Sequence, residues 1–455
     1  MHSHTYQEYM PLRYIDLFAG IGGFHLALDR LGHHCVFASE LKADLRRLYA
    51  INFPGCNIQG DITAIRPEDI PAHDILCAGF PCQPFSQAGK QQGFHDEKKR
   101  GNLFENICDI VAYHRPRYII LENVANLKGH DKGNTWREIY RRLHDVLEYD
   151  VKEKIISPHE FGYPQHRKRI YIVAVDSHQG NLDNFEFPAA TNRRCNIRSV
   201  IDETATQYVH LKPDTRHQLA VWQEFIDQTV AHGQPIPRFP IWAMEFGADY
   251  PIDIAPAKGT ADRLIGKRGK LGRIITPGTL DECLLQLPKY ARTDKDKVFP
   301  KWKIRYIEQN REFYNRNQEW LDVWLQQVQE FENSHLKLEW NCGPRASTTL
   351  DDKIIQFRAS GIRVKLPNFA PALNLVGTQV PILLNIPLPE ATLREDEPGM
   401  GRYMTVPECA RLQGINNPNF WGNAVYHLPQ SRCFDALGNA VNVDVVFLIA
   451  QNLLR

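Results

Sequence analysis

The sequence predicts an α/β fold in which a doubly wound, mostly parallel sheet is accompanied by a second, smaller domain. Between residues 14 and 180, short β-rich runs alternate with helical patterns, as expected for parallel strands joined by crossover helices. From about residue 186 this alternation stops, and prolines and glycines become frequent. A length of 455 residues also agrees with more than one domain.

The expected elements of the first domain follow this alternation. The first strand leads into a glycine-rich turn, and the next helix ends at Gly32, because glycine commonly closes helices. Open α/β sheets bind ligands at the carboxyl ends of such strands. We expect strands at 14–18, 34–39, 74–78, 118–122 and 169–174, and helices at 24–31 and 41–52.

The rest of the chain is less regular. Apolar residues at helical spacing predict helices around 215–232 and over 306–332. The apolar, proline-rich stretch 358–395 is consistent with strands and loops. A helix is expected at 407–412, with Pro407 at its first position, and another at 441–453. We therefore expect a first domain at 1–186, a second at 187–400, and a return to the first at 401–455.

The composition is that of an ordinary globular protein, with 43% hydrophobic and 24% charged residues. The sequence has no apolar run near the length of a membrane span and no signal-peptide pattern at 1–14, so we expect a cytoplasmic protein without a membrane partner. The net charge of +1 identifies no partner by itself. The ten cysteines form no C-x-x-C pair, and their spacing predicts neither a zinc site nor a redox pair.

A glycine-rich turn, DLFAGIGGF at 16–24, joins the first strand to the first helix. Glycines allow a sharp turn and close approach of a ligand, and the following helix would offer free N–H groups. Glu40, at the end of the next strand, suits two ribose hydroxyls. Asp61 would accept from an adenine amino group. The turn alone is compatible with a dinucleotide, a nucleotide, S-adenosylmethionine or no ligand at all.

A cysteine, Cys82, follows the third expected strand in the segment GFPCQPFS at 79–86. Its position at the carboxyl end of a parallel strand is where such sheets bind ligands. Prolines stiffen the backbone on both sides, and the polar, glycine-containing stretch to about residue 101 is suited to closing over a substrate. Taken alone, a cysteine here is as readily a small buried core residue.

Five further segments accompany the cysteine, and together the set resembles the DNA (cytosine-5) methyltransferase family. They are FAGIGG at 18–23, ENV at 122–124, QHRKR at 165–169, a segment at 402–414 that includes TVPECARLQG, and GN at 438–439; the sixth is PCQ at 81–83. The resemblance covers about 14–178 and 402–453. All six stand in the family's order, which makes chance agreement very improbable.

The resemblance implies a Rossmann-like, S-adenosylmethionine-dependent methyltransferase. Its Cys82 thiolate would add to C6 of a cytosine and so activate C5 toward the methyl group. The resemblance assigns to Glu122 a carboxyl that acts at N3 of the ring, which requires a raised pKa. Arg167 and Arg169 are implied as site residues, with the division of roles between them open. No side chain is an evident base for the C5 proton.

The family pattern also implies residues around the cofactor and the DNA. The target base must be flipped out of the duplex. Leu41 stands where many relatives carry an aromatic that stacks on adenine, which puts that contact in doubt. The cofactor residues expected are Asp16, Phe18, Gly20, Gly22, Gly23, Glu40, Leu41, Asp61, Ile62, Pro81, Leu103, Asn439 and Val441. The residues expected to contact DNA are Gln83, Ser86, Arg100, Arg363 and Gln379.

The stretch 187–400 corresponds to the family's variable target-recognition region, where side chains would reach base edges in double-stranded DNA. An arginine there serves equally well as a phosphate contact or a structural ion pair. The expected setting is a monomer associated with the nucleoid, with a cognate restriction endonuclease or defence-system proteins as possible partners. The target sequence itself is not predicted.

Other readings stay open from the residues alone. Glu122 would also serve as a strand-end cap, and 165–169 as a solvated basic loop. A tRNA cytosine-5 methyltransferase would have a short recognition region, whereas this one is long. A catalytically dead DNA-binding relative is disfavoured by the presence of Cys82, Glu122 and Arg167 together. An NAD-dependent dehydrogenase would not explain the later motifs.

Overall fold

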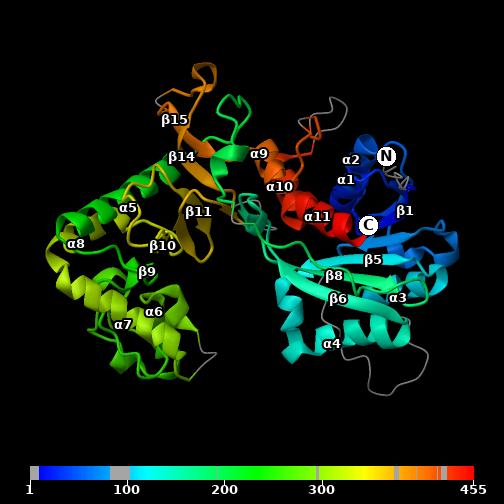
Figure 1. Ribbon diagram of the computed structural model, residues 1–455. Coiled ribbons are helices and arrows are strands. Elements are labelled where there is room, and N and C mark those ends of the chain that lie inside the picture. Colours follow the sequence, from blue (N-terminus) through cyan, green and yellow to red (C-terminus); the bar gives the residue numbers. More distant parts are fainter. Residues whose placement is uncertain are drawn as a thin grey trace. The chain divides into compact units, whose positions relative to one another are not determined.

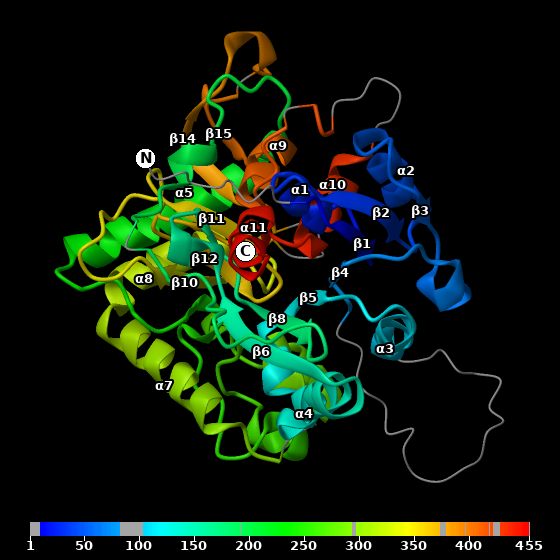
Figure 2. The ribbon, with the colours of Figure 1, turned by 45° about the vertical axis from the view of Figure 1, so that its right-hand side comes forward.

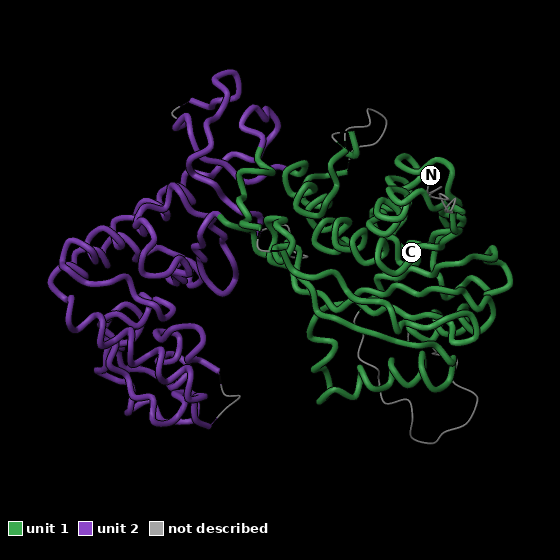
Figure 3. The backbone as a smooth tube through the Cα atoms, viewed as in Figure 1, with its two compact units in different colours: residues 1–201, 368–377, 406–455 green, residues 202–367, 378–405 purple. Residues whose placement is uncertain are grey.

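The structure is a computed structural model, and it describes residues 10–81, 103–191, 193–293, 297–373, 379–395, 397–417, 419–421 and 428–454. The chain forms two compact units, which Figure 3 distinguishes by colour. The first unit comprises residues 1–201, 368–377 and 406–455, and the second comprises 202–367 and 378–405. Each unit is built around a sheet of its own.

The first unit contains a seven-stranded sheet with the order β3-β2-β1-β4-β5-β8-β6. Neighbouring strands from β3 to β5 run parallel, whereas β8 is antiparallel to both β5 and β6. The expected doubly wound, mostly parallel sheet is therefore confirmed. The strands are β1 Arg13–Leu17, β2 His34–Ser39, β3 Ile58–Gln59, β4 Ile75–Ala78, β5 Tyr118–Val124, β6 Tyr149–Ile156 and β8 Arg169–Asp176.

Burial explains the sequences of these strands. The central strand β4 is apolar and buried at all four positions, as is typical of a parallel strand covered on both faces. The edge strand β6 has buried residues interspersed with partly or fully exposed ones, and four of its eight residues are charged. Its weaker apolar pattern explains why the sequence did not reveal β6.

Helices cover both faces of this sheet. Figures 1 and 2 show α3 (Leu103–His114) and α4 (Asn134–Arg141) on one face, and α1 (Gly23–Asp29), α2 (Ala43–Asn52), α10 (Gln430–Asn439) and α11 (Val443–Leu453) on the other. The C-terminal helix α11 packs against α1, so the end of the chain completes the first unit. The segment Gln430–Leu453 is apolar and long enough to cross a membrane, but 78% of its most apolar window is buried in the protein.

The boundaries between the units differ from the expected ones. Residues 187–201 belong to the first unit, where the carbonyl of Val200 accepts from Arg411 of α9 (Val406–Leu412) at 2.8 Å. The short segment 368–377 also returns to the first unit, because β13 (Ala370–Pro371) pairs with β7 (Gln165–His166). Short pairings of this kind leave no periodic signal in the sequence.

The second unit has a six-stranded sheet with the order β15-β14-β11-β12-β10-β9. An aromatic core, which includes Trp222, Phe225 and Trp324, fixes the helices beside it. Its elements are α5 Pro213–Ala231, β9 Ile241–Trp242, α6 Leu280–Leu285, α7 Lys301–Arg316, α8 Gln318–Leu325, β10 Lys337–Asn341, β11 Ile354–Arg358, β12 Gly361–Lys365, β14 Ile382–Pro387 and β15 Met400–Tyr403.

The single helix expected over 306–332 is wrong, because the structure divides this stretch into α7 and α8. The break is at Asn317, whose φ of −125° is not helical. Its side chain replaces the lost backbone bonds: the amide donates to the carbonyl of Phe313 at 2.9 Å, and the oxygen accepts from the indole of Trp320 at 3.3 Å. Apolar spacing continues across the break and therefore conceals it.

Asn310 on α7 provides a stability test for the second unit. It is fully buried; its oxygen accepts from the Trp242 amide at 2.7 Å, and its amide donates to the Pro240 carbonyl at 3.0 Å. Asn310→Ala leaves these buried groups unpaired, and we expect a loss of about 1–3 kcal/mol in the free energy of unfolding. Urea unfolding followed by tryptophan fluorescence measures it, and Glu308→Ala, an exposed change on the same helix, is the control. Equal midpoints for the two variants would contradict the assigned role.

Candidate functional site

The carboxyl ends of four strands meet at one edge of the first sheet. The strand register pairs Leu17 with both Ser39 and Ala78, and Ala78 in turn with Leu121. The residues that follow these positions, among them Phe18, Glu40, Gly79 and Glu122, therefore lie along the same edge. This is the part of an open α/β sheet at which ligands bind.

The turn after β1 has left-handed backbone conformations at three positions, two of which are glycines. Phe18, Gly20 and Gly22 all have positive φ, at 56°, 55° and 86°. A Cβ added to Gly22 would lie 2.4 Å from the ring of Phe53. The amide of Gly20 donates to Glu40 Oε2 at 2.9 Å, and the amide of Lys42 donates to Oε1 at 2.8 Å. Glu40 thus fixes the turn, and within the described part of the chain each of its oxygens accepts one of these two bonds.

The C-terminal segment packs directly against this turn. A Cβ on Gly23 would lie 2.6 Å from the carbonyl oxygen of Val441, and one on Gly79 would lie 3.1 Å from a methyl of the same valine. Val441 is therefore wedged between the turns that follow β1 and β4. Its neighbour Asn439 is exposed, and its amide donates to the Asp435 carbonyl at 3.0 Å.

Asp16 lies at the base of the turn and is fully buried. Neither of its carboxylate oxygens has a hydrogen-bond partner among the residues that the structure describes. Burial raises the pKa of Asp16 well above its usual range, although nearby His25 opposes this effect. An unpaired buried carboxyl is costly, and it favours a cationic or hydrogen-bonding ligand beside the turn.

The remaining expected cofactor residues lie around the same edge. Leu41 is 67% exposed, so its side chain is free to cover a ligand. Asp61 is exposed and its Oδ1 accepts from the Thr63 amide at 3.0 Å, while Ile62 is buried. Pro81 is exposed, and Leu103 begins α3. Cys82, Gln83, Ser86 and Arg100 lie outside the described residues.

Glu122 is the acid at the end of β5, and it is 6% exposed. Arg169, at the start of the neighbouring antiparallel strand β8, places its Nε 3.1 Å from Glu122 Oε1. Burial raises the pKa of Glu122, whereas the positive charges of Arg169 and Arg167 act in the opposite direction. The site therefore holds a carboxyl that can take up a proton more readily than an exposed one.

Arg167 is buried and has a different set of contacts. Its Nη1 donates to the carbonyl of Gly438 at 3.0 Å, and its Nη2 donates to that of Ala440 at 2.9 Å. Its backbone amide donates to Ser157 Oγ at 2.9 Å. Burial and the nearby Arg169 lower the pKa of Arg167 to about 10. The two arginines expected in the site thus differ: Arg169 pairs with the acid, and Arg167 holds the C-terminal segment.

Two further residues belong to the site. Asn123 donates from its amide to the carbonyl of Phe80 at 2.9 Å, which ties the end of β5 to the segment after β4. Gln165 is fully buried, and neither polar atom of its side chain has a partner among the described residues. Asn123 belongs to the ENV motif and Gln165 to the QHRKR motif, and this membership is the sequence signal that points to both residues.

The two expected DNA contacts in the second unit are engaged within the protein. Arg363 lies 3.4 Å from Glu339, and Arg358 lies 2.8 Å from the other oxygen of the same acid. The backbone carbonyl of Gln379 accepts from Gln356 at 2.8 Å. The ion pair with Glu339 holds the guanidinium of Arg363 on β12. Arg358, Arg363 and Glu339 together carry two positive charges and one negative charge, so the group keeps a net positive charge.

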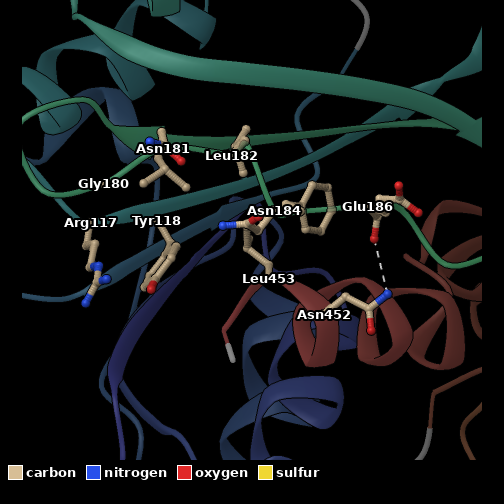
Figure 4. A pocket seen from close by; sticks show the side chains of 11 residues that line it. Arg117, Tyr118, Gly180, Asn181, Leu182, Asn184, Glu186, Asn452 and Leu453 are labelled. Carbon is tan, nitrogen blue, oxygen red and sulfur yellow. Dashed lines mark hydrogen bonds between the residues drawn. The ribbon is translucent and has the colours of Figure 1, made fainter.

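A pocket of about 450 Å³ lies elsewhere in the first unit, and Figure 4 shows it. Arg117 and Tyr118 line it at the start of β5, the opposite end of the strand from Glu122. The amide of Asn452 donates to the carbonyl of Glu186 at its rim, at 3.2 Å. No residue expected in the site lines this pocket.

One family model and several known proteins match this chain. A family model described as C-5 cytosine-specific DNA methylase matches residues 12–455. The type II methyltransferase M.DsaV of Dactylococcopsis salina is 36% identical over 274 residues, which cover 59% of this chain and 75% of that protein. M.HhaI of Haemophilus parahaemolyticus is 40% identical over 48% of this chain and 64% of its own length, just under two thirds. The crystal structure of S. pombe Dnmt2 methyltransferase aligns over 98% of both chains, with 16% identity and a TM-score of 0.47.

The packing of Gly23 against Val441 can be tested by adding a single methyl group. Gly23 is the first residue of α1, where alanine is the better helix former. The contact with the Val441 carbonyl should outweigh this preference, so we expect Gly23→Ala to lower the free energy of unfolding by about 1–3 kcal/mol. Gly55→Ala is the matched control, because a Cβ at Gly55 meets nothing within 4 Å. Thermal unfolding compares them, and a Gly23→Ala protein as stable as the control would refute the close packing.

Proposed function

The chain belongs to the C-5 cytosine-specific DNA methylase family, and on that premise we propose that it transfers a methyl group from S-adenosylmethionine to C5 of a cytosine in a specific duplex DNA sequence. The observation that carries this proposal is Glu122, a buried carboxyl paired with Arg169 at the strand edge that also holds the glycine turn. The names of the relatives, type II methyltransferases, support a role in restriction-modification or a related defence system.

The residues at the turn after β1 fit S-adenosylmethionine. Glu40 can accept hydrogen bonds from ribose hydroxyls, and the buried carboxyl of Asp16, which has no partner among the described residues, would hydrogen-bond to this cofactor. Leu41, Asp61, Ile62, Pro81, Leu103, Asn439 and Val441 complete the proposed pocket. When bound, S-adenosylmethionine supplies an electrophilic methyl group. Leu41 offers an aliphatic cover where relatives of this family stack an aromatic.

Cys82 is the proposed nucleophile, and it lies outside the described residues. Its thiolate would add to C6 of the cytosine, which makes C5 electron-rich. The residues just before it are positioned by the fold, since Asn123 holds the Phe80 carbonyl beside the end of β5. This contact would keep the segment that leads to Cys82 near Glu122.

Glu122 would protonate N3 of the cytosine as negative charge develops on the ring. Burial favours its protonated form, and Arg169 limits this shift and would orient the carboxyl. We propose that Arg169 also contacts the base. Arg167 would act through its two carbonyl contacts, which hold 438–440 and therefore Val441 against the cofactor turn. We propose that Arg167 is a positioning residue rather than a group that touches the base.

The second unit is proposed to recognise the DNA. A cytosine inside a duplex must be flipped out before Cys82 can reach C6, at a cost of a few kcal/mol. The sheet with Arg358 and Arg363 offers guanidinium groups for base edges or phosphates. We propose a protein that works as a monomer on cytoplasmic, nucleoid-associated DNA, with a cognate restriction endonuclease or defence-system protein as its biological partner.

A transfer assay tests the proposed activity directly. Purified protein is incubated with tritiated S-adenosylmethionine and mixed duplex DNA, and tritium should appear as 5-methylcytosine in the DNA. Sequencing of the modified cytosines would then define the recognition sequence. Cys82→Ser should abolish transfer because a hydroxyl is a far weaker nucleophile than a thiolate. Labelling of tRNA instead of DNA, or full transfer by Cys82→Ser, would refute the proposal.

The role of Glu122 gives a separate prediction. Glu122→Gln keeps the size of the side chain but removes the transferable proton, so we expect kcat to fall by about 10²–10⁴-fold while cofactor affinity is largely kept.

The pH dependence of the wild type gives a related test. In the wild type, kcat should fall as pH rises through the raised pKa of Glu122. Arg169→Gln removes a charge that lowers this pKa, so that limb should move to higher pH. Glu68→Gln, an exposed acid, is the control, and unchanged kcat in Glu122→Gln would remove Glu122 from the chemistry.

A further inference from the structure

Two cysteines that are far apart in the sequence meet beneath the cofactor turn. Cys35 lies on β2, and Cys56 lies between α2 and β3. Their sulfurs are 3.1 Å apart and share a hydrogen bond. The hydroxyl of Tyr49 lies 3.8 Å from the first sulfur and 3.9 Å from the second, and the ring of His25 completes the group. We call Cys35, Cys56, His25 and Tyr49 the thiol cluster.

The distance between the sulfurs is short for two thiols that merely pack together. A disulfide bond is about 2.05 Å long, so closure requires the sulfurs to approach by only about 1 Å. Both side chains are partly exposed, whereas Cys77 and Cys108 of the same unit are buried. A small oxidant can therefore reach the pair, while Cys77 and Cys108 are shielded.

The charges around the pair favour a reactive thiolate. Burial alone would lower the pKa of His25, but Asp29, Cys56 and Asp16 raise it to about 9, so the imidazole is positively charged near neutral pH. The shared hydrogen bond lowers the pKa of Cys56 and raises that of Cys35. Cys56 therefore ionises more readily than Cys35, and Cys35 lies where it can act as the resolving cysteine.

We propose that Cys35 and Cys56 form a reversible disulfide when the protein meets a peroxide. The Cys56 thiolate attacks one peroxide oxygen, which breaks the O–O bond, leaves a sulfenic acid on Cys56 and releases hydroxide that takes up a proton to become water. Cys35 then attacks the sulfur of Cys56 and displaces a second water as the S–S bond forms. In total two thiols lose two electrons and two protons, and hydrogen peroxide is reduced to two waters.

A metal ion is the competing use of the same side chains, because His25, Cys35 and Cys56 present ligand atoms within 4.8 Å of one another. Tetrahedral zinc with bonds of about 2.3 Å would hold two sulfurs roughly 3.8 Å apart, farther than they are here. Both ring nitrogens of His25 also have protein partners, with Tyr49 at 2.6 Å and Asp29 at 3.5 Å. The geometry therefore favours disulfide formation over metal binding.

Oxidation would act on the cofactor turn through two packed rings. The ring of Phe53 stacks on His25 with centroids 3.8 Å apart, and the same ring fills the space that a Cβ on Gly22 would occupy. Drawing Cys56 toward Cys35 would move the end of α2, where Phe53 lies, and β2 ends next to Glu40. We infer that the disulfide weakens cofactor binding. This second step rests on the proposed function, whereas the disulfide itself does not.

Peptide mapping tests the disulfide in the full chain. The reduced protein is treated with hydrogen peroxide, blocked with an alkylating agent, digested without reductant and analysed by mass spectrometry. We expect a cross-linked peptide that joins Cys35 to Cys56, that disappears with dithiothreitol and that is absent from Cys56→Ala and Cys35→Ala. Cys108 should stay alkylatable only after unfolding, as a shielded control. Absence of the cross-link, or one zinc per chain in the purified protein by elemental analysis, would overturn the proposal.

Calorimetric titration with S-adenosylmethionine tests the consequence. Oxidised wild-type protein should bind roughly tenfold more weakly than reduced protein, since displacing a positioned group by about 1 Å can cost up to about a hundredfold. Cys35→Ala should bind equally before and after peroxide treatment, which separates this effect from oxidation of Cys82. Equal affinity of oxidised and reduced wild type would overturn the coupling. No binding to the reduced protein would refute the cofactor assignment while leaving the mapped disulfide intact.

Discussion

The buried guanidinium of Arg167 is the contact on which the assembled site depends. It donates to the carbonyls of Gly438 and Ala440, which lie 271 and 273 positions after Arg167 in the chain. The contact therefore ties the C-terminal segment to the end of β7. An arginine in this place costs desolvation, and its two charge-assisted hydrogen bonds offset that cost. Because Val441 follows these carbonyls, the same contact seats the valine against Gly23 and Gly79. The glycines, the valine and the arginine therefore form one packed unit.

A second constraint concerns charge. Arg167, Arg169 and Glu122 lie near one another where β5 ends and β8 begins, and all three side chains are largely buried. Low dielectric strengthens each interaction and makes each unpaired charge expensive. Arg169 forms an ion pair with Glu122, whereas Arg167 donates its hydrogen bonds to two uncharged carbonyls. This separation keeps the carboxyl of Glu122 oriented by Arg169 while burial raises its pKa.

Much of this arrangement was visible in the sequence because it is local. The strand at 34–39 and the glycine turn follow from apolar runs and backbone requirements within a few residues. The break at Asn317 was missed because apolar spacing runs straight through it. The distinct roles of Arg167 and Arg169 depend on carbonyls far along the chain, which no local pattern records. The pairing of Cys35 with Cys56 was missed for the same reason, since 21 positions separate them and only the fold brings them together.

The short segment 368–377 returns to the first unit between two stretches of the second, and Phe369 there stacks near His159 and His166. The second unit is therefore not a single insertion that could be cut out at two points. An exchange of the second unit, which we propose recognises DNA, would have to replace 202–367 and 378–405 together and keep the intervening segment. Recombination at a single junction would combine β13 from one ancestor with β7 from another, although the two strands pair in this fold. In this fold, inheritance of the second unit is constrained by the segment 368–377, which belongs to the first unit.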